Sequence, residues 1–299
     1  MSQNPEISFV VVNYNGIKHT RELLVSIEEH LSEISHEVIV VDNGSVNNES
    51  LPLAKEFPKA IVIRSKSNLG FSGGNNLGIK TSSGRYVMLI NNDTLIRDNS
   101  VSELVKMLDS DPFIGAVSPK IHFMNPPDTI QFAGFTELTR ITLRNRAIGY
   151  NEPDRGQYDT PAETASTHGA AMMVRREVIE RIGYMPEIYF LYYEELDWCA
   201  KMRECGYRLM YQPATLIIHK ESQSTGSDSY LKRYYMTRNR LLFAHRNRRG
   251  FVRFLAIAYQ LLVADPKLLL LSIFKGRRNL VLATLNGVID YFKLNTESV

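Results

Sequence analysis

The sequence predicts an α/β fold built on a mostly parallel β-sheet, followed by a C-terminal helical extension. In the N-terminal third, short β-branched apolar runs alternate with segments of helical spacing, and most of the runs end in turn-forming polar residues. The chain has 299 residues, of which 44% are hydrophobic, so it is long enough to bury a sizeable core.

The alternation defines the elements expected in the first half. Strands are predicted over residues 7–12, 37–41, 60–64 and 86–90, and helices over residues 20–31 and 75–81. The pattern weakens between residues 120 and 166, where an irregular insertion or a mobile flap over a cleft is expected. Periodicity then returns over residues 169–182. A helix is predicted over 194–205, a strand over 209–218 and a helix over 230–246.

The C-terminal part is basic and apolar. Residues 231–299 contain 13 Lys and Arg against 3 Asp and Glu, so this part is expected to meet an anionic partner. Two apolar runs, 251–263 and 268–274, are separated by Asp265-Pro266-Lys267, and each is shorter than the roughly 20 residues that span a bilayer. Two interpretations stay open: interfacial helices on an anionic membrane, or helices that pack on the rest of the chain or on a second subunit.

Several function classes are disfavoured by composition. The two cysteines, Cys199 and Cys205, form no CxxC pair, which indicates a reducing compartment and no disulfide framework. The N-terminus lacks the basic and apolar pattern of a signal peptide, and no nucleic-acid recognition motif is visible. The expected location is the cytoplasm, either free or on the cytoplasmic face of the inner membrane.

Polar residues follow three predicted strands at their carboxyl ends. Asn13, Asp42 and Asp93 each stand there, and ligands of open α/β sheets bind outside these ends. The segment 68–76, NLGFSGGNN, is a glycine-rich turn entering a helix, where backbone N–H groups can approach a phosphate. Taken singly, each of these features is also an ordinary turn.

Carboxylates and a histidine suggest metal binding and acid–base chemistry. Asp93 in Asn91-Asn92-Asp93 can hold Mg²⁺ or Mn²⁺, and His219 at the end of a late strand is a second candidate ligand. Glu194, Glu195 and Asp197 begin a helix, where a carboxylate held ionised by the helix dipole can act as a general base.

The motifs together carry a resemblance to a known family. They are VVNYNG (11–16), VDNGS (41–45), NLGFSGGNN (68–76), INNDT (90–94), THGAAMMVRR (167–176), YYEELDWCAKMRECGY (192–207), IIHK (217–220) and RNR (238–240). In this order, over about residues 5–245, the chain resembles family 2 glycosyltransferases, and within them bacterial rhamnosyltransferases of surface polysaccharide synthesis.

The resemblance implies a GT-A fold, a single Rossmann-like domain that binds a nucleotide diphosphate-sugar and Mn²⁺ or Mg²⁺. It would occupy residues 1–245, with the nucleotide-sugar half near 1–120, the acceptor half near 121–245 and a helical tail over 246–299. The implied metal ligands are Asp93 and His219, and the implied base is Glu195, with Glu194 and then Asp197 as alternatives. The implied donor-binding residues are Asn13, Asn15, Asp42, Asn68, Phe71, Gly73, Asn75, Asn91, Asn92, Asp93 and Arg238, and Arg238 or Arg240 would meet a donor or lipid-acceptor diphosphate.

The resemblance also implies the reaction: inverting, metal-dependent transfer, with L-rhamnose from dTDP-rhamnose as the expected donor. The expected acceptor is a saccharide hydroxyl, carried on a polyprenyl diphosphate. Alternatives are a UDP-hexose or UDP-N-acetylhexosamine donor, or a nucleotide- or sugar-binding module without catalysis. A nucleotidyltransferase is disfavoured, because Asn-Tyr-Asn-Gly follows the first strand where a basic glycine-rich loop would be needed.

Overall fold

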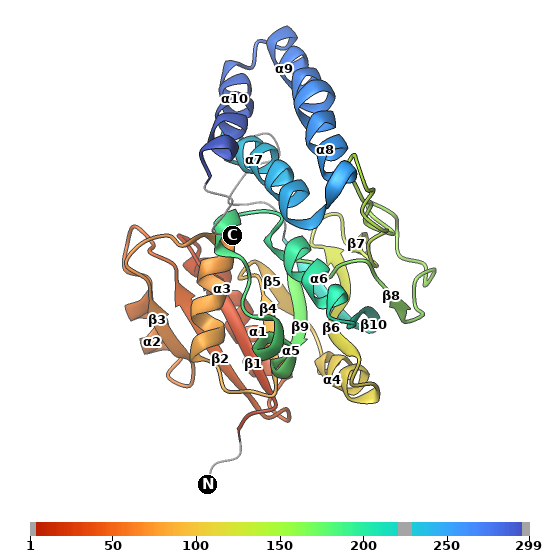
Figure 1. Ribbon diagram of the computed structural model, residues 1–299. Helices are drawn as coiled ribbons and strands as arrows, with labels where there is room; N and C mark the ends of the chain where they lie inside the picture. Colours follow the sequence, from red (N-terminus) through yellow and green to blue (C-terminus); the bar gives the residue numbers. More distant parts are fainter. Residues whose placement is uncertain (1–3, 221–228, 295–299) are drawn as a thin grey trace.

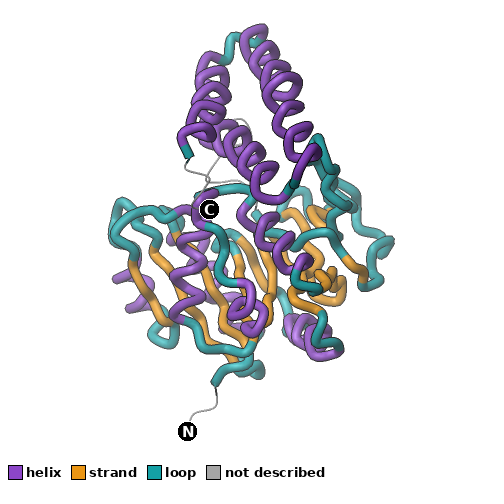
Figure 2. The backbone as a smooth tube through the Cα atoms, viewed as in Figure 1, coloured by secondary structure: helices purple, strands orange, loops and turns teal. Residues whose placement is uncertain are grey.

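The computed structural model describes residues 4–220 and 229–294. An α/β part holds the strands, and helices α7–α10 stand on one end of it (Figures 1 and 2). The amino terminus lies at the opposite end, so β1 runs with its carboxyl end toward these helices (Figure 1). The strands are β1 Ile7–Asn13, β2 His36–Asp42, β3 Ile61–Arg64, β4 Tyr86–Ile90, β5 Thr94–Ile96, β6 Ile114–Phe123, β7 Ile130–Phe132, β8 Ala162–Glu163, β9 Ala171–Arg175 and β10 Arg208–His219.

The α/β part alternates helices with these strands. Its helices are α1 Ile17–His30, α2 Ser50–Glu56, α3 Gly70–Thr81, α4 Val101–Ser110, α5 Arg176–Ile182 and α6 Glu194–Glu204. The C-terminal helices are α7 Tyr230–Asn247, α8 Gly250–Tyr259, α9 Asp265–Phe274 and α10 Arg278–Lys293. The α/β class with a C-terminal helical extension is therefore confirmed.

The sheet is mixed, with a parallel N-terminal half. Its order is β3-β2-β1-β4-β9-β6-β10-β5, and the pairs β3–β2, β2–β1, β1–β4 and β6–β10 are parallel. Strand β9 is antiparallel to both β4 and β6 and joins the two halves. The carboxyl ends of β1, β2 and β4 therefore share one edge of the sheet. This is the arrangement predicted from the polar residues that follow these strands, Asn13, Asp42 and Asp93.

Both faces of the sheet are covered, which explains the continuous apolar runs of the central strands. On one face, Phe9 and Val11 pack with residues of α1 and α4, including Leu23 and Leu104. On the other, Val10 packs with residues of α3, α5 and α6, Trp198 among them. Successive residues of β1 point to opposite faces, so each one meets a helix.

The glycine-rich segment is a helix rather than a turn that leads into one. Helix α3 begins at Gly70, five residues earlier than predicted, because its glycines allow it to lie very close to the sheet. A Cβ atom on Gly78 would stand 2.3 Å from Cγ1 of Val10, and one on Gly74 would stand 2.9 Å from Cγ1 of Val12. These two glycines therefore serve helix–sheet packing.

The segment between residues 120 and 166 is largely irregular, as predicted, but it is anchored. It follows the long strand β6, which the sequence analysis missed together with α2, α4 and α10. Buried Lys120 pairs with Asp154 and Asp159, and Nε2 of His122 lies 2.8 Å from Asp154 Oδ2. This cluster ties the insertion to the sheet.

The C-terminal helices differ from the prediction of two short apolar helices. The Asp265-Pro266-Lys267 segment does not interrupt the helical run, in which Pro266 stands at the start of α9. A π-helical turn, Gln260–Ala264, joins α8 to α9. Over Gly250–Phe274 the result is one helical run of 25 residues. Its most apolar stretch of 18 residues has mean hydropathy 1.6 and is 22% buried, so by length and composition the run is long enough to cross a membrane.

Candidate active site

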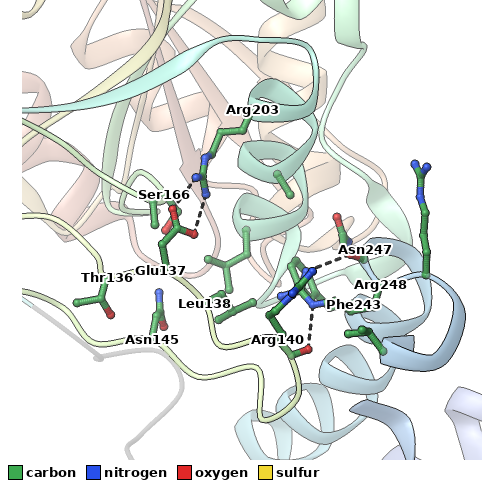
Figure 3. A pocket seen from close by; sticks show the side chains of 15 residues that line it. Thr136, Glu137, Leu138, Arg140, Asn145, Ser166, Arg203, Phe243, Asn247 and Arg248 are labelled. Atoms are coloured by element: carbon green, nitrogen blue, oxygen red, sulfur yellow. Dashed lines mark hydrogen bonds and ion pairs between the residues drawn. The ribbon is translucent and has the colours of Figure 1, made fainter. Parts of the chain in front are cut away.

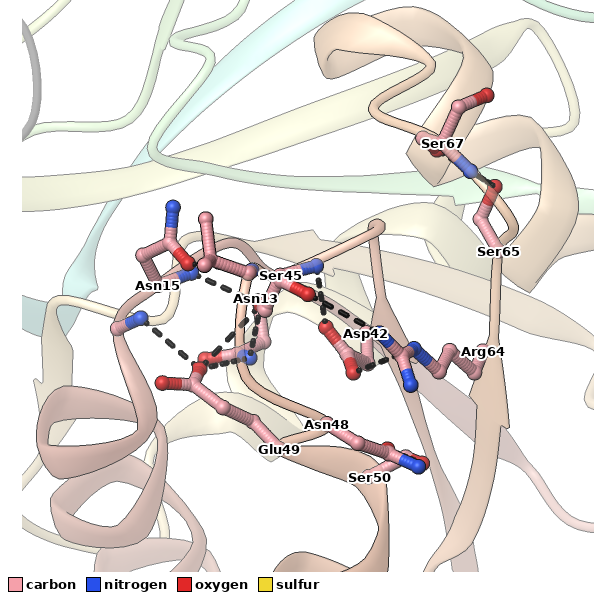
Figure 4. Close-up of polar contacts among 12 residues, drawn as sticks. Asn13, Asn15, Asp42, Ser45, Asn48, Glu49, Ser50, Arg64, Ser65 and Ser67 are labelled. Carbon is pink, nitrogen blue, oxygen red and sulfur yellow. Dashed lines mark hydrogen bonds and ion pairs between the residues drawn. The ribbon is translucent and has the colours of Figure 1, made fainter.

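The ends of β1 and β2 form one hydrogen-bonded polar edge (Figure 4). Fully buried Asn13 donates through Nδ2 to Oε2 of Glu49 at 2.8 Å, and its Oδ1 accepts from Oγ1 of Thr20 at 2.7 Å. Oδ1 of Asn15 accepts from the backbone N–H of Val46 at 2.9 Å, which ties the turn after β1 to the turn after β2. The two strand ends are thus held in a fixed relation.

Asp42 closes this edge on the β3 side. Its fully buried carboxylate accepts from the backbone N–H of Ser45 through Oδ1, and Oδ2 lies 3.4 Å from Nε of Arg64 (Figure 4). Nearby, Oδ1 of Asn68 accepts from the Gly70 N–H and from Nδ2 of Asn43. Asn13, Asn15, Asp42 and Asn68 therefore lie along one edge, as predicted.

Asp93 and His219 are brought together by the sheet. Strand β5 pairs antiparallel with β10 so that Thr94 lies opposite His219, which places the preceding Asp93 beside that histidine. Nε2 of His219 lies 3.1 Å from Oδ1 of Asp93, and both side chains are mostly buried. Asn92, which directly precedes Asp93, donates to Oγ1 of Thr20 and so joins this pair to the polar edge at β1.

The orientation of the pair suits a bound cation. Nδ1 of His219 lies 2.8 Å from Oε1 of Gln131, and this contact fixes the ring with Nε2 toward Asp93. Burial alone would raise the pKa of Asp93, but the hydrogen bond and charge of His219 outweigh it and lower that pKa. A carboxylate and an imidazole nitrogen are a donor set that suits Mn²⁺, so the residues fit the ion. No cluster of three or more His, Cys, Asp or Glu side chains suited to a metal occurs among residues 4–220 and 229–294.

An aromatic path leads from this pair toward a cavity. The rings of His219 and His168 are 6.3 Å apart, and His168 stacks on Phe135 at 5.9 Å. Burial lowers the pKa of His168 to about 3, with the neighbouring His219 as a lesser cause, so the His168 ring is uncharged and packs between His219 and Phe135. Phe135 is itself part of the wall of a cavity of about 580 Å³ that also contains Glu195.

The chain just before α6 is strained. Phe190, Tyr192 and Tyr193 have φ values of 63°, 68° and 77°, in the left-handed region that side chains other than glycine rarely adopt. Each such residue costs on the order of 1–3 kcal/mol, and such residues cluster at functional sites. Tyr193 is the N-cap of α6, so the strain fixes the direction in which Glu194 and Glu195 leave the helix start.

Helix α7 holds this strained segment. Nδ2 of fully buried Asn239 lies within 3.0 Å of the carbonyl oxygens of Tyr189, Leu191 and Tyr192. Arg238 donates to the carbonyls of Ile188 and Tyr189 at 2.9 and 2.7 Å. Arg238, which is mostly buried and was predicted to contact a diphosphate, thus also holds the backbone before α6.

Helix α3 fixes the other side of the same segment. The backbone N–H of Phe71 donates to the Phe190 carbonyl at 2.7 Å. The two preceding amides also have protein acceptors, Asn43 for Leu69 and Asn68 for Gly70. These three amides were expected to approach a phosphate, and the structure gives them other partners. Gly73 and Asn75 lie within the helix, where Asn75 donates to the Phe71 carbonyl.

The two glutamates at the start of α6 have different surroundings. Glu194 is 2% exposed, whereas Glu195 is half-buried and lines the cavity. Burial, and then the charge of Glu195, raise the pKa of Glu194 well above its usual range. Burial also raises the pKa of Glu195, with the backbone amides at the helix start opposing it. Glu194 therefore holds its proton more strongly than Glu195, and Glu195 is the member that lines the cavity, although its Oε2 is itself buried.

Asp197, the third acid of this cluster, has a structural role. Its Oδ2 accepts from Tyr189 Oη, Arg246 Nε and Asn247 Nδ2, at 2.6 to 2.9 Å. Those contacts join α6 to the end of α7. Asn239, Gln131 and Glu49 also support the site and were not singled out from the sequence, because only the folded chain brings them to residues remote in sequence.

A second hollow of about 400 Å³ lies behind the loop that carries Leu138 and Asn145 (Figure 3). Arg203 and Glu137 form a bidentate ion pair across it, and Arg248 donates to the Arg140 carbonyl at 3.1 Å (Figure 3). Glu137 is therefore paired with Arg203, and Arg140, Arg248 and Arg249 also line this hollow.

Comparison with known proteins adds a family match. The family model described as glycosyl transferase family 2 matches residues 8–183. The chain is 28% identical over 242 residues to the low-salt glycan biosynthesis hexosyltransferase Agl10 of Haloferax volcanii, over 79% of this chain and 75% of that protein. It is 26% identical over 308 residues to the dTDP-rhamnosyl transferase RfbF of Shigella flexneri, over 95% of this chain and 96% of that protein.

A solved structure supports the fold. The mannosyltransferase PcManGT from Pyrobaculum calidifontis, in complex with GDP-Man and Mn²⁺, superposes with a TM-score of 0.59 at 18% identity, over 99% of this chain and 79% of that chain. The predicted GT-A fold is therefore confirmed.

Replacing Asn239 tests the role assigned to α7. Asn239→Ala leaves buried carbonyls before α6 without a donor, so we expect a loss of about 1–3 kcal/mol in the free energy of unfolding. We also expect kcat to fall by about tenfold or more, because Glu195, the base expected from the sequence, would be misplaced, with a smaller change in the donor KM. Urea unfolding and steady-state kinetics measure both.

Asn286→Ala is the matched control, because Asn286 makes only an exposed hydrogen bond to Tyr230 Oη. It should change stability by less than about 0.5 kcal/mol and leave kcat unaltered. Equal effects of the two substitutions would contradict the positioning role of Asn239.

Proposed function

Because this chain belongs to glycosyltransferase family 2 and is a nucleotide-sugar-dependent enzyme, we propose that it transfers L-rhamnose from dTDP-rhamnose to a saccharide hydroxyl. The observation that carries the sugar assignment is the similarity to a dTDP-rhamnosyl transferase, which extends over 95% of this chain and so includes the C-terminal helices. The similarity to a hexosyltransferase over 79% of the chain supports the alternative, a UDP-hexose or UDP-N-acetylhexosamine donor.

The polar edge at β1, β2 and β4 is our proposed donor site. Asn13, Asn15 and Asp42 would contact the nucleotide, and Asn68 with the start of α3, which includes Phe71, Gly73 and Asn75, would border its base and ribose. Asn91 and Asn92 would lie beside the sugar diphosphate. The mutual hydrogen bonds of Asn13, Asn15 and Asp42 support this, because a preorganised site loses less entropy on binding.

Asp93 and His219 are our proposed ligands for Mn²⁺ or Mg²⁺. Their 3.1 Å approach and the orientation of the His219 ring set by Gln131 support this assignment. When bound, the ion would neutralise charge on the departing diphosphate.

Glu195 is our proposed general base, because its carboxyl lines the cavity and Glu194 is enclosed. The acceptor hydroxyl oxygen forms a bond to the anomeric carbon, and its proton passes to Glu195. The bond from that carbon to the diphosphate oxygen breaks, and its electron pair leaves with the nucleoside diphosphate. Attack from the face opposite the leaving group inverts the configuration.

The C-terminal helices are suited to binding a membrane surface. Residues of α8–α9 such as Phe251, Phe254 and Phe274 are exposed, and basic residues such as Arg249, Arg253 and Lys275 flank them. We propose that the enzyme acts on the cytoplasmic face of the inner membrane on a polyprenyl-diphosphate-linked saccharide. A homodimer through the same apolar surface is the alternative that size-exclusion chromatography would reveal.

Substitution of the two glutamates separates their roles. Glu195→Gln removes the base, so we expect kcat to fall by about 10²- to 10⁴-fold. Glu194→Gln resembles the protonated carboxyl already present, so we expect most of the activity to remain. In the parent enzyme kcat/KM should fall as the pH drops through the raised pKa of Glu195, above the value of about 4.3 of a solvated glutamate. The opposite ranking of the two variants would make Glu194 the base.

A donor panel tests the proposed reaction. We would incubate the purified chain with Mn²⁺ or Mg²⁺, a polyprenyl-linked acceptor and dTDP-rhamnose, UDP-glucose, UDP-galactose or UDP-N-acetylglucosamine, and measure nucleoside diphosphate release. We expect release from dTDP-rhamnose that disappears with EDTA and in Asp93→Ala or His219→Ala. Release from a UDP-sugar alone would replace the rhamnose assignment with the alternative.

A further inference from the structure

The hollow behind the loop at residues 136–145 adjoins the cavity that holds Glu195. It has a volume of about 400 Å³ and lies between that loop, helix α6 and the junction of α7 with α8 (Figure 3). Leu138, Asn145 and Leu196 line both spaces. Because Leu196 directly follows Glu195 in the chain, a ligand larger than one sugar unit at the proposed base can extend into the hollow.

The wall of the hollow carries more positive than negative charge. Four arginines line it, Arg140, Arg203, Arg248 and Arg249, and Glu137 is the acidic residue of the described wall. Glu137 is already held by both terminal nitrogens of Arg203. The other three arginines form no ion pair with any residue that the structure describes. Three unpaired cations at one concave surface favour an anionic ligand.

Arg248 is positioned by neutral partners. It is half-buried, and its guanidinium donates to the carbonyl oxygens of Arg140 and Asn247 at 3.1 and 3.0 Å. The same group lies over the ring of Phe243, 5.6 Å from its centre. Burial and then the charge of Arg140 lower the pKa of Arg248, and Glu137 opposes them. The guanidinium is therefore fixed in direction while its charge is uncompensated, which preorganises it for a carboxylate or phosphate.

A buried hydroxyl in the same wall lacks a partner. Ser166 lines the hollow and is 3% exposed, and its Oγ has no hydrogen-bond partner among the described residues. An unpaired buried hydroxyl is unfavourable, and an oxygen of a ligand would satisfy it. The amide of Asn145 and the apolar side chains of Leu138 and Phe243 complete the wall. Such a mixture of polar and apolar groups suits an organic ligand better than a bare ion.

We propose that the hollow binds an acidic sugar unit of the acceptor, with its carboxylate on Arg140 and Arg248 and one of its hydroxyls on Ser166. The inference rests on the proposed function, because it adds to the reacting unit at Glu195 a neighbouring unit that the enzyme also recognises. A phosphate ion would suit the arginines but would fill little of a hollow of about 400 Å³. A hexuronate has hydroxyls for Ser166 and Asn145 in addition to its carboxylate.

Matched sugar pairs test the proposal without a donor. D-Glucuronate and D-galacturonate differ from D-glucose and D-galactose by a carboxylate in place of a hydroxymethyl group. The whole chain is first freed of metal by dialysis, so that no ion at Asp93 and His219 recruits the carboxylate. Titrations followed by ligand-observed NMR give the four affinities. We expect each uronate to bind at least about tenfold more tightly than its neutral partner.

Substitutions in the wall locate the binding. Arg140→Gln should weaken uronate binding by about tenfold and change neutral-sugar binding by less than about twofold, because Arg140 is exposed and contributes charge. Ser166→Ala should weaken all four sugars by about threefold without lowering the melting temperature, because its Oγ has no partner in the free chain. Arg155→Gln is the matched control, an exposed arginine of the same irregular segment outside the hollow, and should change neither.

Three results would overturn the proposal. The first is equal affinity of the parent chain for uronates and neutral sugars. The second is loss of uronate binding in Lys232→Gln rather than in Arg140→Gln, which would place the carboxylate in the Glu195 cavity. The third is inorganic phosphate that binds at least as tightly as the uronates and is lost in Arg140→Gln, which would make the hollow a free-anion site.

The inference and the proposed function fail in different ways. Sugar transfer by an enzyme that binds uronates and neutral sugars equally would refute the inference alone. Uronate binding that depends on Arg140, without sugar transfer from any donor, would refute the proposed function and leave the uronate site in place.

Discussion

The site depends on the hydrogen bonds that Asn239 makes to the carbonyls of Tyr189, Leu191 and Tyr192. The same segment contains three non-glycine residues in left-handed conformations, Phe190, Tyr192 and Tyr193. Such an arrangement persists only where the surrounding contacts hold the backbone in place. Arg238 and the Phe71 amide supply further contacts. Because Tyr193 both ends this segment and caps α6, the contacts set the direction of Glu195. Helix α7 therefore positions the proposed base and also supports the other C-terminal helices.

Glu194 and Glu195 differ in burial and therefore in the roles proposed for them. Two neighbouring carboxylates with little access to water cannot both be ionised at low cost, and the more enclosed Glu194 holds its proton more strongly. Glu195, at the cavity wall, is left as the group that can accept a proton from a ligand. The metal pair is organised in a similar manner, since Gln131 fixes the His219 ring and leaves Nε2 directed at Asp93. In both places a neighbouring side chain, Glu194 or Gln131, influences the protonation or the orientation of the group proposed to react.

Local pattern was enough to predict the strands that end at Asn13, Asp42 and Ile90, because buried parallel strands have continuous apolar sequences. It also predicted α6 and β10. Contacts between distant segments were not predictable: Arg238 resembles a phosphate ligand in sequence, and only the fold shows its guanidinium on the carbonyls of Ile188 and Tyr189. Helix α3 was placed too late because glycine disfavours helices in isolation, and here close packing on β1 outweighs that preference. The predicted break at Pro266 was wrong, because the π-helical turn Gln260–Ala264 directly before it carries the helical run from α8 into α9.

The central claim is that one carboxylate, Glu195, drives a single displacement at the anomeric carbon. The most direct test is the anomeric configuration of the first-formed product, measured by proton NMR with the donor that the enzyme consumes. A single displacement predicts inversion, which for a β-L-rhamnosyl donor gives an α-L-rhamnoside. Retention of configuration would require two displacements and a covalent or ion-pair intermediate, and it would contradict the assignment of Glu195 as the base.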